Sequence, residues 1–158
     1  MSVPARKQIK DLFEGLLGRD VTLGDAPPVT LDRVPPPMVA VYVDDQLKLA
    51  TVTVMDFALT AFVGAALGLV PKGGAEAAIE DAIMPQSLIE NAAELLNVLA
   101  APIGEASRTH QRLYKTYPPG DIPPADVAGL TALLGSREDV LLDVKGYGAG
   151  PMSLIAAP

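Results

Sequence analysis

Residues 38–55, with the sequence MVAVYVDDQLKLATVTVM, place two runs of β-branched residues on either side of Asp-Asp-Gln. Such runs favour extended strands, and the polar tripeptide between them is typical of a tight turn. In the second run, Leu47, Leu49, Thr51 and Thr53 alternate with Lys48, Ala50, Val52 and Val54, which predicts at least one buried face. The stretch therefore predicts a β-hairpin, and we interpret Asp44 and Asp45 as turn residues rather than as metal ligands.

Helical and extended patterns alternate on both sides of this hairpin. Helices are predicted over residues 5–17, 57–69, 75–82, 85–102 and 124–134. A strand is predicted over 108–117, and a closing hairpin over 139–157 has Gly146, Gly148 and Gly150 at its bend. Strands joined mainly by hairpins indicate an α+β fold, mainly an antiparallel sheet packed with helices. We expect a single domain over residues 1–158, which includes the N-terminal helix 5–17 and the Pro-rich loop 24–37.

Composition excludes several classes of function. The chain has 158 residues and a net charge of −7, and its Lys and Arg are not clustered. Nucleic acid and anionic membranes are therefore poor candidates for partners. Cysteine is absent and His110 is the only histidine, so neither a thiolate site nor a multi-histidine metal site is available within the chain. The longest apolar run, 57–70, is too short for the roughly twenty residues that cross a bilayer. We expect a soluble cytoplasmic protein.

A narrow polar stripe follows the predicted helix over residues 85–102. Glu90, Glu94, Asn97 and Ala101 fall within about 60° on a helical wheel. The opposite side carries Leu88, Ala92, Leu95, Leu96, Leu99 and Ile103. Solvation alone explains most stripes of this kind. However, two like charges four residues apart disfavour the helix, and asparagine is a poor residue within one. The stripe is thus either a solvated face or a set of side chains that contact one partner together.

Glu94-Leu95-Leu96-Asn97 resembles the Glu-x-x-Asn motif of the CheC/CheX-like phosphatases of bacterial chemotaxis. The order of elements over residues 38–156 is similar as well, with a strand pair, a helix, a loop, the motif helix and a glycine-containing hairpin. The CheX branch is the most similar. This resemblance implies a CheC-like fold.

The resemblance also implies a substrate, which is the aspartyl phosphate of a response-regulator receiver domain. Asn97 would orient the attacking water, and Glu94 would pair with a lysine of the receiver. Glu90 and Ala101 would lie at the contact with this partner. Magnesium would belong to the receiver, so no cofactor or metal is expected in this chain. The sequence departs from the family at Ala101 and Pro102, where relatives often carry Gly-Asn. Pro102 lacks a backbone donor and would end or kink the helix a turn beyond Asn97.

Two other interpretations stay open at this point. One is a non-catalytic module of the same fold, such as a signalling adaptor or a relative of the flagellar-switch proteins. The other is a small-molecule domain with an apolar pocket lined by Ala61, Val63 and Leu99. A symmetric homodimer through the Ala-rich helices is a further expectation. We interpret His110 as a residue of the predicted strand.

Overall fold

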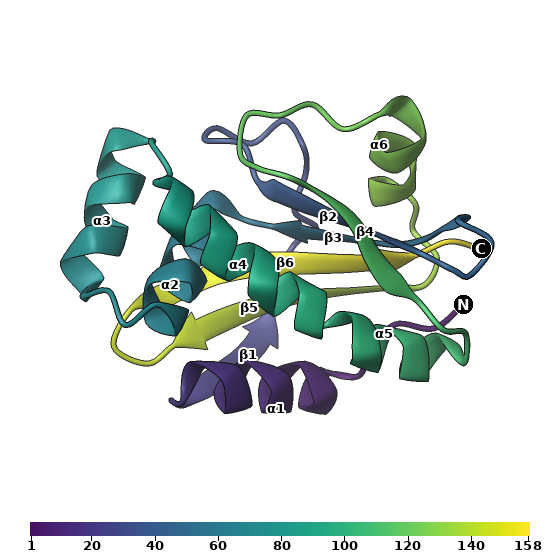
Figure 1. The fold of residues 1–158 in the computed structure, drawn as a ribbon, viewed down its shortest axis with the longest axis horizontal. Coiled ribbons are helices and arrows are strands. Elements are labelled where there is room, and N and C mark those ends of the chain that lie inside the picture. The colour runs from purple at the N-terminus through teal and green to yellow at the C-terminus, as the bar shows by residue number, and fades with distance from the viewer.

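The computed structural model describes residues 1–158, and its elements are arranged as Figure 1 shows. In chain order they are α1 (Arg6–Leu17), β1 (Val21–Asp25), β2 (Met38–Val43), β3 (Leu49–Met55), α2 (Phe57–Leu67), α3 (Lys72–Asp81), α4 (Gln86–Val98), α5 (Ala100–Ser107), β4 (Arg112–Tyr117), α6 (Ala125–Thr131), β5 (Arg137–Val144) and β6 (Gly148–Ala156). The two ends of the chain lie side by side, and the N-terminal amino group donates to Ala157 O at 3.3 Å.

The strands form one antiparallel sheet in the order β1-β5-β6-β3-β2-β4. The predicted hairpin over 38–55 is β2 and β3, with Val41 opposite Val52. The predicted closing hairpin is β5 and β6, and β6 joins the first hairpin by pairing with β3. The expected α+β fold with a mainly antiparallel sheet is therefore confirmed.

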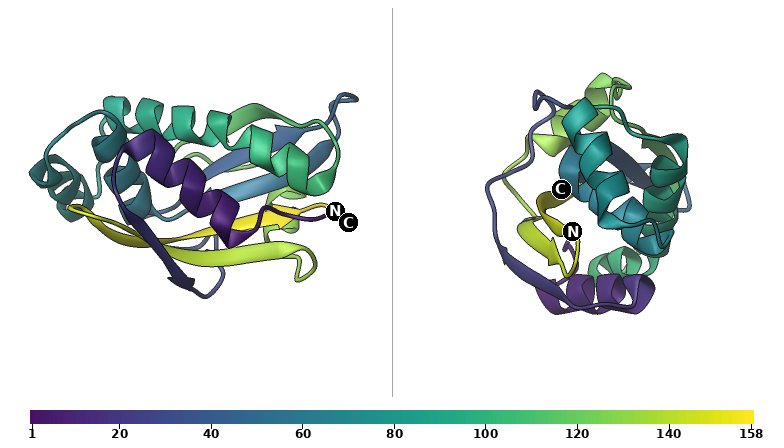
Figure 2. Two further views of the ribbon diagram at one scale, coloured as in Figure 1. Left: turned by 90° about the horizontal axis from the view of Figure 1, so that it is seen from below. Right: turned by 90° about the vertical axis from the view of Figure 1, so that its left-hand side faces the viewer.

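Helices cover both faces of the sheet, but unequally. Figure 2 shows α1 and α4 on one side, where a core cluster of 28 buried residues lies between helices and sheet. A second cluster of 9 residues lies on the opposite face, beneath α6. In β2, Met38, Ala40 and Tyr42 belong to the larger cluster, whereas Val39 and Val41 belong to the smaller one. Burial on both faces explains why β2 is apolar at every position.

The first strand, β1, corrects one prediction from the sequence. No element was predicted over residues 19–23 and a Pro-rich loop was predicted from residue 24, but residues 21–25 pair with β5 from Val21↔Val144 to Asp25↔Val140. The turn before β1 contains Gly18, whose φ of 65° is the left-handed conformation that glycine adopts readily. The carboxylate of Glu14 then accepts a hydrogen bond from Val21 N at 3.0 Å. The sequence of residues 21–25 does not predict these contacts, because they depend on residues that lie elsewhere in the chain.

The sequence predicted that Gly146, Gly148 and Gly150 all lie at the bend of the closing hairpin, but only one of them does. Gly146, with φ 85°, lies in the turn, but Gly148 and Gly150 lie within β6. A Cβ atom at Gly150 would lie 2.7 Å from Leu59 Cβ, and one at Gly148 would lie 2.6 Å from Phe62 Cζ. These two glycines let α2 pack directly against the strand.

Three other boundaries also differ from the predictions. α3 begins at Lys72, before the predicted start at residue 75. The predicted helix over 85–102 is divided at Leu99 into α4 and α5. His110 precedes β4 instead of lying in it. No helix of this structure combines the length and apolarity that crossing a membrane requires.

Candidate functional site

The helix α4 is held against α2 by an unusually close backbone contact. A Cβ atom at Gly64 of α2 would lie only 2.4 Å from Leu88 O, so no other residue fits without a shift. One turn further along α4, Asn91 Nδ2 donates to Gly64 O at 3.0 Å. Because these contacts take up the side of α4 that carries Leu88 and Asn91, they fix which side of the helix faces solvent.

A second anchor connects α4 to the sheet below it. The hydroxyl of Tyr42, in β2, donates to Leu96 O at 2.5 Å. Tyr42 is fully buried, and burial raises the pKa of its phenol above the ordinary tyrosine value. The phenol therefore stays protonated, and remains a donor, well into the alkaline range. The helix is thus fixed by one polar contact on each of two neighbouring elements.

With α4 held in this way, the polar stripe of the sequence faces outward. Glu90, Glu94, Asn97 and Ala101 are all exposed, while Leu88, Ala92, Leu95, Leu96, Leu99 and Ile103 on the opposite side are buried. Glu90 Oε1 accepts a hydrogen bond from Gln86 Nε2 at 3.4 Å. The side chains of Glu94 and Asn97 take part in none of the hydrogen bonds or ion pairs within the chain. Both are therefore free to contact another molecule.

The helix is interrupted immediately after these residues. α4 ends at Val98, and α5 begins at Ala100 after Leu99, whose φ and ψ are −62° and −19°. Pro102 has no N–H to donate to Val98 O, which accounts for a break within one turn before the proline. The interruption therefore lies closer to Asn97 than the sequence suggested. Ala101 consequently belongs to α5, where it is exposed.

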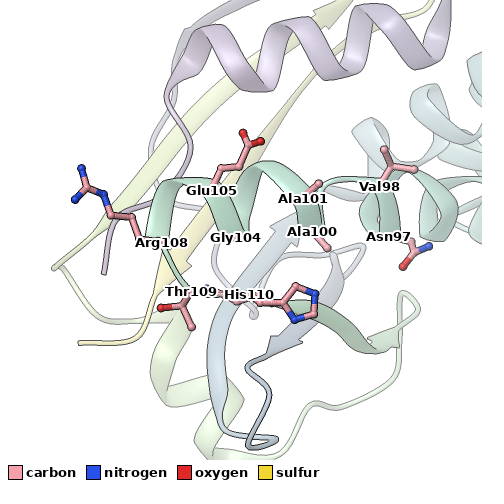
Figure 3. Close-up of a pocket in the computed structure, with 10 residues that line it drawn as sticks. Asn97, Val98, Ala100, Ala101, Gly104, Glu105, Arg108, Thr109 and His110 are labelled. Carbon is pink, nitrogen blue, oxygen red and sulfur yellow. The ribbon is translucent and has the colours of Figure 1, made fainter.

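An open hollow of about 690 Å³ adjoins the stripe at this break. Its lining combines α4 and α5 with the segment that leads into β4, and consists of Asn97, Val98, Ala100, Ala101, Gly104, Glu105, Arg108, Thr109, His110 and Gln111. Most of these residues are labelled in Figure 3. Of the predicted site residues, Asn97 and Ala101 line the hollow, whereas Glu90 and Glu94 lie outside it along α4.

His110 and Asp45 form a contact that the sequence did not indicate. His110 Nδ1 lies 2.7 Å from Asp45 Oδ1, which joins the turn between β2 and β3 to the segment before β4. Both side chains are more than half exposed. The expected role of Asp44 as a turn residue is confirmed, because its Oδ1 accepts from Gln46 N and Lys48 N. No local pattern links positions 65 residues apart, so only the fold brings this pair together.

The apolar pocket that the small-molecule interpretation requires around Ala61, Val63 and Leu99 is not present. All three side chains are completely buried in the larger core cluster, and none lines a hollow. The small residues of α2 instead allow close packing against α4 and β6, as the glycine contacts show. The structure thus contradicts a small-molecule site at this place.

The stripe lies in the most acidic part of the chain. Residues 73–107, which include most of α3 and all of α4 and α5, contain no Lys, Arg or His and six acidic residues, namely Glu76, Glu80, Asp81, Glu90, Glu94 and Glu105. They carry a formal charge of −6, compared with −7 for the whole chain. All six acidic residues are exposed and none forms an ion pair within the chain. No group of three or more acidic or histidine side chains in the structure could hold a metal ion.

Comparison with solved structures identifies proteins of the same fold. The FliM domain of H. pylori, in its complex with SpeE, superposes with a TM-score of 0.61 at 8% identity, covering 95% of this chain and 80% of that one. In the FliG–FliM complex the TM-score is 0.59 at 9% identity, with 95% and 87% covered. FliY of Thermotoga maritima gives 0.52 at 15% identity, with 94% and 82% covered.

The finer assignment to the CheX branch stays a prediction. CheX of Desulfovibrio desulfuricans covers 94% of this chain and 93% of its own at 10% identity, but its TM-score is only 0.44. No family model matches the sequence. No curated protein matches it either. The chain has the α+β fold of the FliM middle domain and of FliY, which confirms the expected CheC-like fold.

Proposed function

We propose that this chain is a CheC/CheX-like cytoplasmic protein that docks on a phosphorylated receiver domain and hydrolyses its aspartyl phosphate. The observation that carries the proposal is the state of Glu94 and Asn97. They are exposed one turn apart on one side of α4, and the opposite side of α4 is held by α2 and β2. Neither side chain has a hydrogen-bond or ion-pair partner within the chain. A helix surface that served only stability would pair such groups with Lys or Arg.

The chemistry requires little more than this arrangement. An acyl phosphate is already labile, so hydrolysis depends mainly on holding a water molecule in line with the bond that breaks. A carboxamide such as that of Asn97 both donates and accepts hydrogen bonds, and can therefore orient this water without titrating. Glu94 would pair with a lysine of the receiver and so set the register, with Glu90 and Ala101 at the edge of the contact. The receiver would supply the magnesium ion.

A second candidate is a binding module of the same fold without catalytic activity. The division of the helix at Leu99 favours it, because Asn97 lies one residue before the end of α4 and Pro102, within α5, lacks the N–H that would bond to Val98 O. FliM domains of this fold have been solved in complexes with FliG and with SpeE. A protein of this fold can therefore bind other proteins. In this case the acidic stripe would contact a basic surface of the partner.

The two candidates are separated by the lifetime of a phosphorylated receiver domain from the same organism. We expect wild-type protein to shorten this lifetime, Asn97→Ala to abolish the effect while binding persists, and Glu94→Ala to weaken binding. Glu76→Ala, at an exposed acidic position of α3, is the matched control and should change neither quantity. Binding of the receiver without any change in its lifetime would establish the module instead. If the protein neither binds nor dephosphorylates the tested receivers, the proposal is wrong.

A further inference from the structure

The hollow beside Asn97 contains the only histidine of the chain, and the proposed function assigns no role to it. His110 lines the same hollow as Asn97. Figure 3 shows its imidazole and the Asn97 carboxamide on the same side of the helix, with Ala100 between them, while Glu105 and Arg108 project elsewhere. The imidazole is therefore the titratable group that faces the space in front of Asn97.

The backbone that carries His110 is firmly held. Arg108, with φ 57°, ends α5, and Thr109 N donates to Gly104 O at 3.2 Å. Ser107 Oγ lies within 3.3 Å of Thr109 N and accepts from Gln111 Nε2 at 2.9 Å. A Cβ atom at Gly104 would lie 3.3 Å from Thr109 O, so glycine lets this segment pack directly on α5. The backbone at His110 is thus held by contacts of the residues before it and after it in the chain.

The ring of His110 is oriented by a separate element. Its Nδ1 lies 2.7 Å from Asp45 Oδ1, and Asp45 lies in a turn that is itself held by the two hydrogen bonds to Asp44. A carboxylate at Nδ1 stabilises the tautomer that carries the proton on Nδ1, which leaves a lone pair on Nε2. Carboxylate-oriented imidazoles of this kind act as general bases in several unrelated enzymes.

We propose that His110 is the general base of this site and that Asp45 is its positioning residue, an inference that rests on the proposed phosphatase function. In this step the oxygen of the water held by Asn97 bonds to phosphorus while the bond between phosphorus and the aspartyl oxygen breaks. The electron pair leaves with the aspartyl carboxylate. One proton of the water passes to His110 Nε2 and is later released to solvent, so the products are the free aspartate and inorganic phosphate.

An exposed ion pair with no catalytic role is the competing explanation, and it predicts different results. Such a pair contributes little to stability and nothing to the rate. Lys145–Asp20 offers a matched control, since its side chains are 75% and 77% exposed compared with 71% and 67% for His110–Asp45. It lies outside the hollow that contains Asn97. A change that is specific to His110 can therefore be distinguished from the general effect of losing a surface pair.

The test is the single-turnover rate of phosphate release from a phosphorylated receiver domain, measured beside the Kd for the same receiver carrying beryllofluoride. We expect His110→Gln to lower the rate at least about tenfold with Kd unchanged, which is less than the usual effect of a general base because an acyl phosphate is labile. Added imidazole should restore part of the activity of His110→Ala. Asp45→Ala should lower the rate. Asp45→Asn should retain more of the rate than Asp45→Ala, because an amide oxygen still accepts a hydrogen bond from Nδ1–H. The control Lys145→Gln should match the rate of wild type.

The outcomes separate this inference from the function on which it rests. Wild-type protein that does not accelerate phosphate release overturns both. Active wild type with an equally active His110→Gln variant overturns only the role of His110. A His110→Gln variant that loses affinity in proportion to its rate shows a binding contact, which also overturns the role as a base.

Discussion

At the scale of single residues, Asp139 is a half-buried carboxylate that accepts three hydrogen bonds. Its carboxylate accepts two hydrogen bonds from Arg137, both at 2.9 Å, and one from Ser153 Oγ at 2.5 Å. Arg137 also donates to Thr131 O and Leu133 O, and Ser153 Oγ accepts from Val29 N. This group therefore connects β5, β6, the end of α6 and the Pro-rich loop.

The protonation of Asp139 predicts how stability depends on pH. Burial raises its pKa, but the hydrogen bonds from Arg137 and Ser153 outweigh burial, so the pKa in the folded protein lies below the ordinary value. Because the pKa of Asp139 is lower in the folded chain than in the unfolded chain, its carboxylate stabilises the fold fully at any pH above the unfolded-state pKa, near 3.9. This stabilisation is lost as the pH falls through the pKa of the folded state. We expect Asp139→Asn to lower the unfolding free energy at pH 7 by about 2 kcal/mol.

The measurement is urea unfolding of wild type and Asp139→Asn at pH 7 and at successively lower pH. The difference between the two proteins should shrink in acid, because protonation removes the same charge that the substitution removes. Asp143→Asn, at an exposed position of the same strand, is the control and should behave like wild type throughout. A difference that stays constant from pH 7 into acid would show that the Asp139 charge is not what stabilises the fold.

At the scale of elements, the contact between α2 and α4 decides where the site lies. At Gly64 the backbones of the two helices are in direct contact, with Leu88 O and Leu88 Cα as the atoms in the way of a Cβ. Backbone atoms cannot rotate aside as a flexible side chain can. The orientation of α4, and with it the direction of Glu94 and Asn97, therefore depends on the absence of a side chain at Gly64.

This dependence predicts opposite effects of the same substitution in two helices. Gly64→Ala should destabilise the fold by about 1–3 kcal/mol, because α4 must move away from α2. Gly15→Ala in α1 should stabilise it by up to about 1 kcal/mol, because a Cβ at Gly15 meets no atom within 4 Å and alanine is the better helix former. Chemical denaturation of both variants provides the test, and a neutral Gly64→Ala would mean that the helices can separate without cost.

At the scale of the whole molecule, the two faces of the sheet are stabilised unequally. The cluster beneath α1, α2 and α4 contains 28 buried residues, whereas the one beneath α6 contains 9. Fewer buried apolar contacts give a segment a lower free energy of local opening. The candidate site thus lies on the more strongly packed face.

Native-state hydrogen exchange should reveal this asymmetry. We expect the amides of α6 to exchange through openings of lower free energy than those of α4 or β3. Val127→Ala, which removes a buried contact of α6, should accelerate exchange in α6 while leaving α4 almost unchanged. Uniform protection of α4 and α6 would show instead that both faces open together in one global transition.

The sequence by itself predicted the features that depend on neighbouring residues. The runs around Asp44 identified the β2–β3 hairpin, and the spacing of Leu88, Leu95 and Leu96 identified the buried side of α4. From the same spacing the exposed stripe of Glu90, Glu94 and Asn97 could be predicted, because helical periodicity relates residues only three or four positions apart. The motif that suggests the function was therefore visible before the fold was known.

Only the tertiary structure decided the features that join distant segments. β1 forms because β5 offers it a partner, and Gly148 and Gly150 are required where α2 crosses β6. His110 acquires Asp45 as a partner only when the β2–β3 turn meets the segment before β4. The physical reason is that propensity and periodicity act over a few residues, whereas these contacts exist only after the chain has closed loops of many tens of residues.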